Sequence, residues 1–224
     1  MVPLHRHQLA WLGALGWRRV LDRDWDAEAR DCLAHWAAMR LPLVVTRQIV
    51  SDEGTVSLGL PAPQRWGRRR LAITVTRNDP LYFGEFPSAD QMAGLLPAPA
   101  RPAWRRLCAD LGAAKVDACV YGSYGWQMLS GLDHVRVGSD IDLWLSVFGV
   151  AQADAAAACL QSACGELPRL DGELMFDDGA AVAWREWLAW RAGHVKSLLV
   201  KTIAGSSLVH SRAWQGAAVF LAAA

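Results

Sequence analysis

Two aspartates one residue apart are the strongest chemical signal in the chain. Asp140 and Asp142 lie at the start of an apolar segment, residues 141–147, whose pattern is typical of a buried strand. Residues i and i+2 of a strand share a face, so the two carboxylates point the same way. Their repulsion favours a neutralising cation, and Mg²⁺ is usually held by one or two carboxylates together with substrate phosphates. The pair predicts a metal-dependent phosphate site with Asp140 and Asp142 as metal ligands.

A glycine and a serine upstream supply the other half of such a site. In the segment YGSYGW, residues 121–126, Gly122 lets the backbone come close to a ligand. A helix that begins just after it presents unpaired N–H groups to an anion, and the Ser123 hydroxyl can bond a phosphate oxygen. We expect Gly122, Ser123 and Tyr124 to bind substrate. The alternative is that Ser123 only caps a helix and that the two aspartates form a solvated strand end.

Alternating elements must position these residues. The apolar periodicity after residue 102 predicts a helix at 103–113, strands at 115–121 and 141–147, a helix at 151–164, and a hairpin with strands at 170–176 and 180–184. Asp177, Asp178 and Gly179 are expected to form the turn of that hairpin, because Asp-Gly favours such turns.

The first part of the chain is predicted to be mixed α and β. An amphipathic helix covers 24–40, with an aspartate to cap it, and strands follow at 43–50 and 71–76. Ser88 to Gln91 has the pattern of a capping box that opens a short helix. Three prolines over 97–102 then predict a linker, so that residues 1–96 form a smaller N-terminal α/β domain and residues 103–224 the catalytic domain.

Composition describes a folded globular chain. Of the 224 residues, 53% are hydrophobic and 20% charged, which excludes extended disorder, and a net charge of +1 gives no overall field for nucleic acid or anionic lipid. The apolar runs fall short of the roughly 20 residues that span a bilayer. The five cysteines are odd in number and lack a CxxC pair, so a reducing cytoplasm is the expected location.

Several common catalytic motifs are missing from the sequence. Neither GxxxxGK nor GxGxxG occurs, and there is no GxSxG elbow of a serine hydrolase. The six histidines show no HxxxH pairing, so no zinc site is predicted.

The Gly-Ser and Asp-x-Asp elements together resemble the nucleotidyltransferase superfamily of the polymerase β type, with a longer gap between them than usual. Within that superfamily the chain most resembles the phosphoribosyl-dephospho-CoA transferase of malonate decarboxylase, also called its holo-acyl-carrier-protein synthase. The resemblance runs nearly end to end, through HQLAWL at 7–12, LGLP at 58–61, RRRLA at 68–72, YGSYGW at 121–126, SDIDL at 139–143 and LDGEL at 170–174.

This resemblance implies an α+β fold, in which a nucleotidyltransferase-like mixed sheet follows the smaller domain. It implies transfer of the 2′-(5-triphosphoribosyl)-3′-dephospho-CoA group to a serine of the apo acyl-carrier subunit of malonate decarboxylase, with release of diphosphate. It also implies two Mg²⁺ ions, or Mn²⁺, held by Asp140 and Asp142. Such ions activate the attacking hydroxyl and stabilise the leaving oxygen.

The superfamily also has a third carboxylate on a later strand, and two residues compete for that role. Asp171 and Glu173 alternate on one face of the strand at 170–176. Asp171 is preferred for its place at the strand start. Downstream, Lys201 and Lys196 are candidates to bind the polyphosphate, the alternative being a solvated helix face.

Two other interpretations stay open. One is a generic nucleotidyl or adenylyl transferase that acts on a small molecule or RNA, although the sequence shows no RNA-binding module and neither nucleic acid nor membrane is an expected partner. The other is a non-catalytic binding module with the same fold. A basic cluster at residues 65–70 is a candidate docking surface for an acidic carrier protein or for the donor's phosphates.

Overall fold

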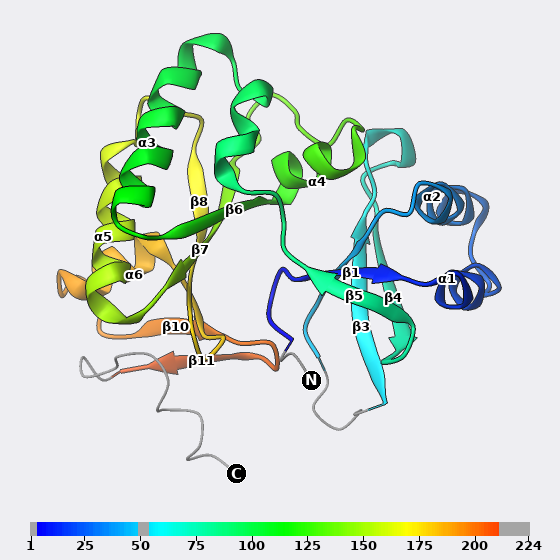
Figure 1. Cartoon of the computed structure of the whole chain (residues 1–224). Helices are drawn as coiled ribbons and strands as arrows, with labels where there is room; N and C mark the ends of the chain where they lie inside the picture. Colours follow the sequence, from blue (N-terminus) through cyan, green and yellow to red (C-terminus); the bar gives the residue numbers. More distant parts are fainter. Residues whose placement is uncertain (1–3, 49–53, 211–224) are drawn as a thin grey trace.

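The chain folds into two β-sheets that stand side by side, each with its own helices (Figure 1). The computed structural model describes residues 4–48 and 54–210. The first half contains β1 (Leu9–Leu12), α1 (Ala14–Leu21), α2 (Ala27–Ala38), β2 (Leu43–Val45), β3 (Thr55–Pro61), η1 (Gln64–Trp66), β4 (Arg70–Thr76) and β5 (Pro80–Gly84). The second half contains η2 (Ala89–Leu95), η3 (Ala98–Ala100), α3 (Arg101–Ala113), β6 (Asp117–Tyr121), α4 (Gly122–Ser130), β7 (Ile141–Val147), α5 (Gly149–Ser162), β8 (Leu170–Phe176), β9 (Ala181–Ala183), α6 (Trp184–Arg191), β10 (Leu198–Lys201) and β11 (Ser206–Val209).

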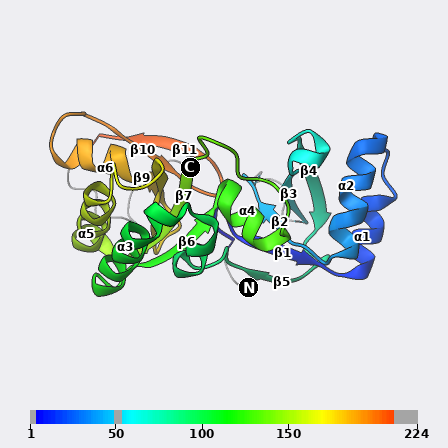
Figure 2. The same ribbon diagram turned by 90° about the horizontal axis from the view of Figure 1, so that it is seen from above.

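The first sheet is antiparallel, with the strand order β4-β3-β2-β1-β5. Helices α1 and α2 cover its outer face, where Leu33 and Trp36 pack with Leu58 and Ile73 in one buried core. Alternation along β4 sends every second residue into that core and leaves Arg70 and its i+2 neighbours on the opposite face. In the view from above, this helix-free face is turned toward the second sheet (Figure 2).

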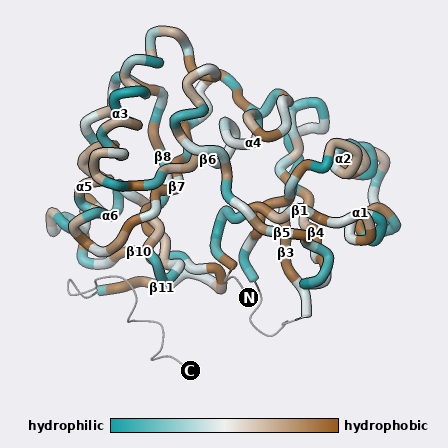
Figure 3. The backbone as a smooth tube through the Cα atoms, viewed as in Figure 1, coloured by the Kyte–Doolittle hydropathy of each residue, from teal (hydrophilic) through white to brown (hydrophobic). Residues whose placement is uncertain are grey.

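The second sheet is mixed, with the order β11-β10-β9-β8-β7-β6. Strands β7 and β8 are parallel and are connected by α5, whereas the other neighbours pair antiparallel. Helices α3, α5 and α6 pack against this sheet, and strongly hydrophobic stretches lie along strands of both sheets, including β3, β7 and β10 (Figure 3). The mixed α+β architecture predicted from the sequence is confirmed.

Helix α4 connects the two cores. Tyr124 is buried in the core of the second sheet, and Trp126, two residues later, is buried in the core of the first. The YGSYGW segment therefore forms both the turn from β6 into α4 and the packing between the two halves.

Most of the long predicted elements are present. Asp26 caps α2 by accepting a hydrogen bond from the backbone N–H of Ala29 at 2.9 Å. The hairpin turn is also confirmed: the Asp178 carboxylate accepts a hydrogen bond from the Ala180 N–H, and Gly179 has a φ of +81°. Of the strand expected at 43–50, β2 covers the first three residues, and residues 49 and 50 lie outside the described part of the chain.

The second strand of the hairpin, expected at 180–184, forms as β9 and is one residue shorter at each end. The chain then enters α6 at Trp184, because Trp184, Trp187 and Trp190 bury one face of a helix against the second core. The capping box predicted at Ser88 is wrong, since the Ser88 side chain makes no cap hydrogen bond and η2 is a 3₁₀ helix.

The segment between the sheets packs with the second half. Ala89, Met92 and Leu96 are buried in the core of the second sheet, and residues 97–102 form η3 and the first turn of α3. The division into 1–96, 97–102 and 103–224 stays a prediction, and its last residues, 211–224, lie outside the described part. All five cysteines are free thiols, and no helix in the described residues is long and apolar enough to cross a bilayer.

The contact between α4 and β6 gives the first prediction. A Cβ atom at Gly125 would lie 2.2 Å from the carbonyl oxygen of Val120 and 2.8 Å from the ring of Phe86. Gly125→Ala is therefore expected to reduce the free energy of unfolding by about 1–3 kcal/mol. Thermal unfolding should show a melting temperature lower by about 2–4 °C for each kcal/mol.

Gly112→Ala in α3 is the matched control. Among the described residues, nothing outside the helix lies within 4 Å of a Cβ atom at that position, so alanine should leave the melting temperature unchanged or raise it slightly. If both variants melted like the parent chain, the close approach of α4 to β6 would be contradicted.

Candidate active site

A cleft of about 730 Å³ opens between the two sheets. The first sheet lines it with residues of β2, β3 and β4, and the second half lines it with the junction of β6 and α4 and with Asp142 of β7. The predicted residues Gly122, Ser123 and Asp142 thus meet in one place, whereas Tyr124 is buried behind them in the core.

The β6–α4 junction comes very close to Asp142. Gly122 has a φ of +61°, in the region that favours glycine, and a Cβ atom there would lie 1.9 Å from Oδ2 of Asp142. Only glycine fits between the turn and the carboxylate. This close approach places the N-terminus of α4, with Ser123 in its first turn, beside Asp142.

Three aspartates gather at this end of the cleft. The parallel register of β7 and β8 sets Asp142 directly opposite Asp171, and Asp140 immediately precedes β7. Burial raises the pKa of the Asp142 carboxyl to about 7, and the neighbouring charges of Asp171 and Asp140 add to that rise. Arg169 partly offsets the charge by donating a hydrogen bond to Asp140 at 3.2 Å.

This charge imbalance fits a hard cation. A divalent ion beside Asp142 would remove the repulsion that raises its pKa, and oxygen ligands suit Mg²⁺. Within residues 4–48 and 54–210, no three acidic, histidine or cysteine side chains converge closely enough to enclose a metal ion by themselves. An ion held by Asp140 and Asp142 therefore needs further oxygen ligands from a bound phosphate or from water.

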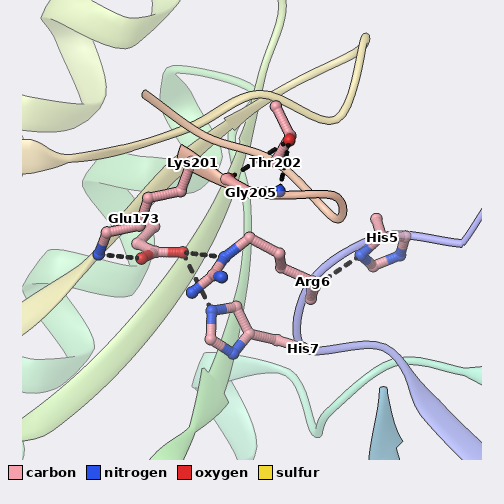
Figure 4. A network of polar contacts seen from close by, with 7 residues as sticks. All are labelled: His5, Arg6, His7, Glu173, Lys201, Thr202 and Gly205. Carbon is pink, nitrogen blue, oxygen red and sulfur yellow. Dashed lines mark hydrogen bonds and ion pairs between the residues drawn. The ribbon is translucent and has the colours of Figure 1, made fainter. Parts of the chain in front are cut away.

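Glu173 has a different environment from Asp171. Its carboxylate is 4% exposed and accepts hydrogen bonds from Lys201 Nζ at 2.8 Å, His7 Nε2 at 3.0 Å and Arg6 Nε at 3.4 Å (Figure 4). Burial alone would raise the pKa of Glu173, but the hydrogen bonds from His7 and Lys201 outweigh it and hold the pKa at about 2. Of the two candidates for the third carboxylate, Asp171 faces Asp142 and Glu173 binds basic side chains.

The two predicted lysines are separated. Lys201 lies in β10 and contacts Glu173, whereas Lys196 is exposed in the loop between α6 and β10. The alternative that these lysines lie on a solvated helix face is wrong, because this segment forms a loop and a strand.

Sequence reasoning assigned no role to Arg6 and His7. Both residues reach from the start of the chain to Glu173, and the His7 ring also stacks on Tyr121 with ring centroids 4.1 Å apart. The HQLAWL segment contributed to the family resemblance, but no local pattern indicates a contact between residues 166 positions apart in the chain.

Comparisons with known proteins agree with this architecture. Residues 5–80 match the family model described as the phosphoribosyl-dephospho-CoA transferase MdcG N-terminal domain, and residues 87–212 match its C-terminal domain. A protein named phosphoribosyl-dephospho-CoA transferase from Bradyrhizobium diazoefficiens is 38% identical over 202 residues, which cover 90% of this chain and 88% of that protein. Proteins of the same name from Xanthomonas axonopodis pv. citri and Pseudomonas syringae pv. tomato are 34% and 32% identical, covering 88% and 80% of this chain and 90% and 84% of their own lengths. No solved structure matches.

The matched domains include strands of both sheets and every residue that lines the cleft except Phe86. The chain belongs to the phosphoribosyl-dephospho-CoA transferase family, and the resemblance inferred from the sequence is confirmed.

The raised pKa of Asp142 predicts a gain in stability when its charge is removed. The cost of ionising this carboxyl in the folded state is absent below its ordinary pKa of 3.8 and complete above about pH 7. Asp142→Asn is therefore expected to unfold less readily than the parent chain at pH 8 in EDTA, by about 1–4 kcal/mol, with a smaller gain at pH 5. Thermal unfolding at the two pH values measures the difference.

An exposed aspartate in α3 provides the control. Asp110→Asn should change stability by less than about 0.5 kcal/mol at either pH. Lower stability of Asp142→Asn at pH 8 would contradict the repulsion between the three carboxylates.

The Glu173 contacts predict the opposite effect. Glu173→Ala leaves three basic side chains without their shared carboxylate, so the free energy of unfolding should fall by about 3 kcal/mol. Because the pKa of Glu173 is lowered, its contribution is fully present above pH 4.5 and is lost as the pH falls through about 2. Urea unfolding of the parent chain and of Glu173→Ala should therefore show a larger difference in the free energy of unfolding at pH 7 than at pH 3.

Glu166, which pairs with Arg106 at the surface, is the control for this variant. Glu166→Ala should cost less than about 1 kcal/mol. Equal losses in the free energy of unfolding for the two variants would contradict a stabilising role for the contacts of Glu173 with the first half of the protein.

Proposed function

We propose that this protein transfers the 2′-(5-triphosphoribosyl)-3′-dephospho-CoA group to a serine of the apo acyl-carrier subunit of malonate decarboxylase. The reaction forms a phosphodiester and releases diphosphate. Family membership supports the donor, and the observation that carries the chemistry is the close approach of the β6–α4 junction to Asp142, which puts phosphate-binding groups beside an acidic cluster.

The acidic cluster is our candidate for the metal site. Asp140 and Asp142 are proposed to hold Mg²⁺, as two ions, with Mn²⁺ as a substitute, and Asp171 is the candidate third carboxylate. When bound, such ions lower the pKa of the attacking hydroxyl and stabilise the charge on the leaving oxygen.

The protein's own groups orient the donor. We assign to the Ser123 hydroxyl and to the N–H groups of the first turn of α4 the role of donating hydrogen bonds to the phosphate oxygens, and the position of Ser123 in the cleft lining supports this role. Tyr124, buried behind Ser123, fixes the start of α4. Lys201 adds positive charge next to β8, and Glu173 holds it in position. A role for Lys196 in binding the polyphosphate stays a prediction, since Lys196 is not among the residues that line the cleft.

The mixed sheet, with the acidic cluster on neighbouring strands, supports the proposal of a nucleotidyltransferase-like fold for the second half. Five free thiols support the proposal of a reducing, cytoplasmic location.

The mass of the carrier subunit tests this function. Purified apo carrier incubated with the protein, Mg²⁺ and the triphosphoribosyl-dephospho-CoA donor should gain the mass of the donor minus diphosphate, and EDTA should prevent the gain. Asp140→Ala and Asp142→Ala should each lower the rate about 100-fold or more, because charge stabilisation in the transition state is lost. Asp110→Ala in α3 should react like the parent chain.

Two results would contradict the proposal. Transfer of label from ATP to an acceptor, without reaction of this donor, would indicate a generic nucleotidyltransferase. Binding of the carrier without any transfer would indicate a non-catalytic module.

A further inference from the structure

The arginine cluster at residues 65–70 separates into two groups in the structure. Arg69 donates hydrogen bonds to both oxygens of Asp26 at 2.7 and 2.6 Å, and the Arg65 guanidinium lies over an indole ring at 3.7 Å. Neither of these two side chains lines the cleft. Arg68 and Arg70 do, on the side formed by the first sheet.

The positive charges of Arg68 and Arg70 have no carboxylate partner in the described part of the chain. Arg68 donates hydrogen bonds to neutral acceptors, the His134 carbonyl oxygen at 2.9 Å and Gln64 Oε1 at 3.2 Å. Arg70 lies exposed at the start of β4 and forms no ion pair among residues 4–48 and 54–210. Burial lowers the pKa of His134, which lines the cleft, to about 4, and the positive charge of Arg68 adds to this lowering. The charge of Arg68 therefore acts on a residue of the cleft wall.

The backbone at Arg68 is held in an unusual conformation. Its φ of +55° lies in the left-handed region that residues other than glycine rarely adopt, directly after Gly67 at +64°. Such a conformation is kept only where the surrounding structure imposes it, and here it accompanies a side chain at the edge of the cleft.

Small residues form the wall next to these arginines. Val44 pairs with Gly59 and Gly59 with Ala72, so the three lie in a row across β2, β3 and β4 on the face turned toward the cleft. Pro61 pairs with Arg70 in the same register, which places the arginine beside this row. This row of small, uncharged side chains suits an uncharged part of a ligand.

The cleft therefore has two walls of opposite charge. Asp142 and the start of α4 belong to the wall from the second half, suited to a phosphate chain with its cation, and Arg68 and Arg70 belong to the wall from the first sheet, suited to a second anion. ATP carries a single phosphate chain. The donor of the proposed reaction carries a triphosphate and, beyond two riboses, the diphosphate of its dephospho-CoA part.

We propose that Arg68 and Arg70 bind the diphosphate of the dephospho-CoA part of the donor, against the wall formed by Val44, Gly59 and Ala72. These two arginines thereby select the donor over ATP. This inference rests on the proposed function, because it assigns one end of that substrate to the first sheet.

Binding of 3′-dephospho-CoA alone tests the inference without any transfer. Calorimetry in the presence of EDTA excludes any contribution to binding from a metal ion at Asp140 and Asp142. The parent chain should bind this compound, and Arg68→Gln and Arg70→Gln should each weaken binding about tenfold, since each removes a charged donor to a phosphate. Arg65→Gln, in the same cluster but outside the cleft, should bind within about twofold of the parent chain.

A second measurement separates this subsite from the triphosphate end. ATP binding with Mg²⁺ should be unchanged in Arg70→Gln and weakened in Asp142→Ala. The inference is overturned if the parent chain does not bind dephospho-CoA at millimolar concentration, if Arg70→Gln binds it normally, or if only the KM for the carrier protein rises in the transfer assay. If the parent chain binds dephospho-CoA as expected but carries out no transfer, the proposed function is contradicted and the dephospho-CoA subsite is still supported.

Discussion

The repulsion among carboxylates at the β7–β8 pair governs the arrangement around the cleft. Parallel pairing puts Asp142 against Asp171, and the partial burial of Asp142 reduces the screening of the two charges by water. The turn at Gly122 brings the start of α4 close to the Asp142 carboxylate. Under the proposed function, binding of a cation with its phosphate ligand removes this repulsion, and the empty site therefore favours that complex.

Two acidic residues on one strand have been given opposite roles by their neighbours. Asp171 faces another carboxylate, whereas Glu173, two positions later, is surrounded by Arg6, His7 and Lys201. Alternation along a strand explains why both point to the same side. The packing of the N-terminal segment and of β10 against Glu173 distinguishes the two residues. Strand periodicity alone could therefore not predict which of them stays available to a ligand.

The same distinction separates what could be predicted from the sequence and what could not. Periodicity placed α2, β7 and β8, and the spacing of Gly122, Ser123 and the two aspartates indicated one phosphate site. The strands β1, β5, β10 and β11 were not expected, because short strands carry weak patterns that tertiary pairing completes. The longer β3 was not expected either, because Gly59 and Pro61 weaken its strand pattern. The site was incomplete for the same reason: Arg6 and His7 act through contacts across the whole chain, and which arginines of the cluster face the cleft depends on the turn at residues 67 and 68.

The contribution of the first sheet follows from the geometry of its two faces. One face is covered by α1 and α2, and the other, with Val44, Gly59 and Ala72, has no helix of its own and forms a wall of the cleft. Glu173 connects this half to β8 and β10 through Arg6 and His7, and Trp126 connects it through α4, so two separate sets of contacts join the two halves. A long ligand with two separate anionic groups binds best when its two binding sites are held at a fixed distance, because ordering a flexible cleft would cost in entropy what the second anion site gains. Under the proposed function, the contacts of Glu173 and Trp126 that join the two sheets therefore also contribute to recognition of the donor.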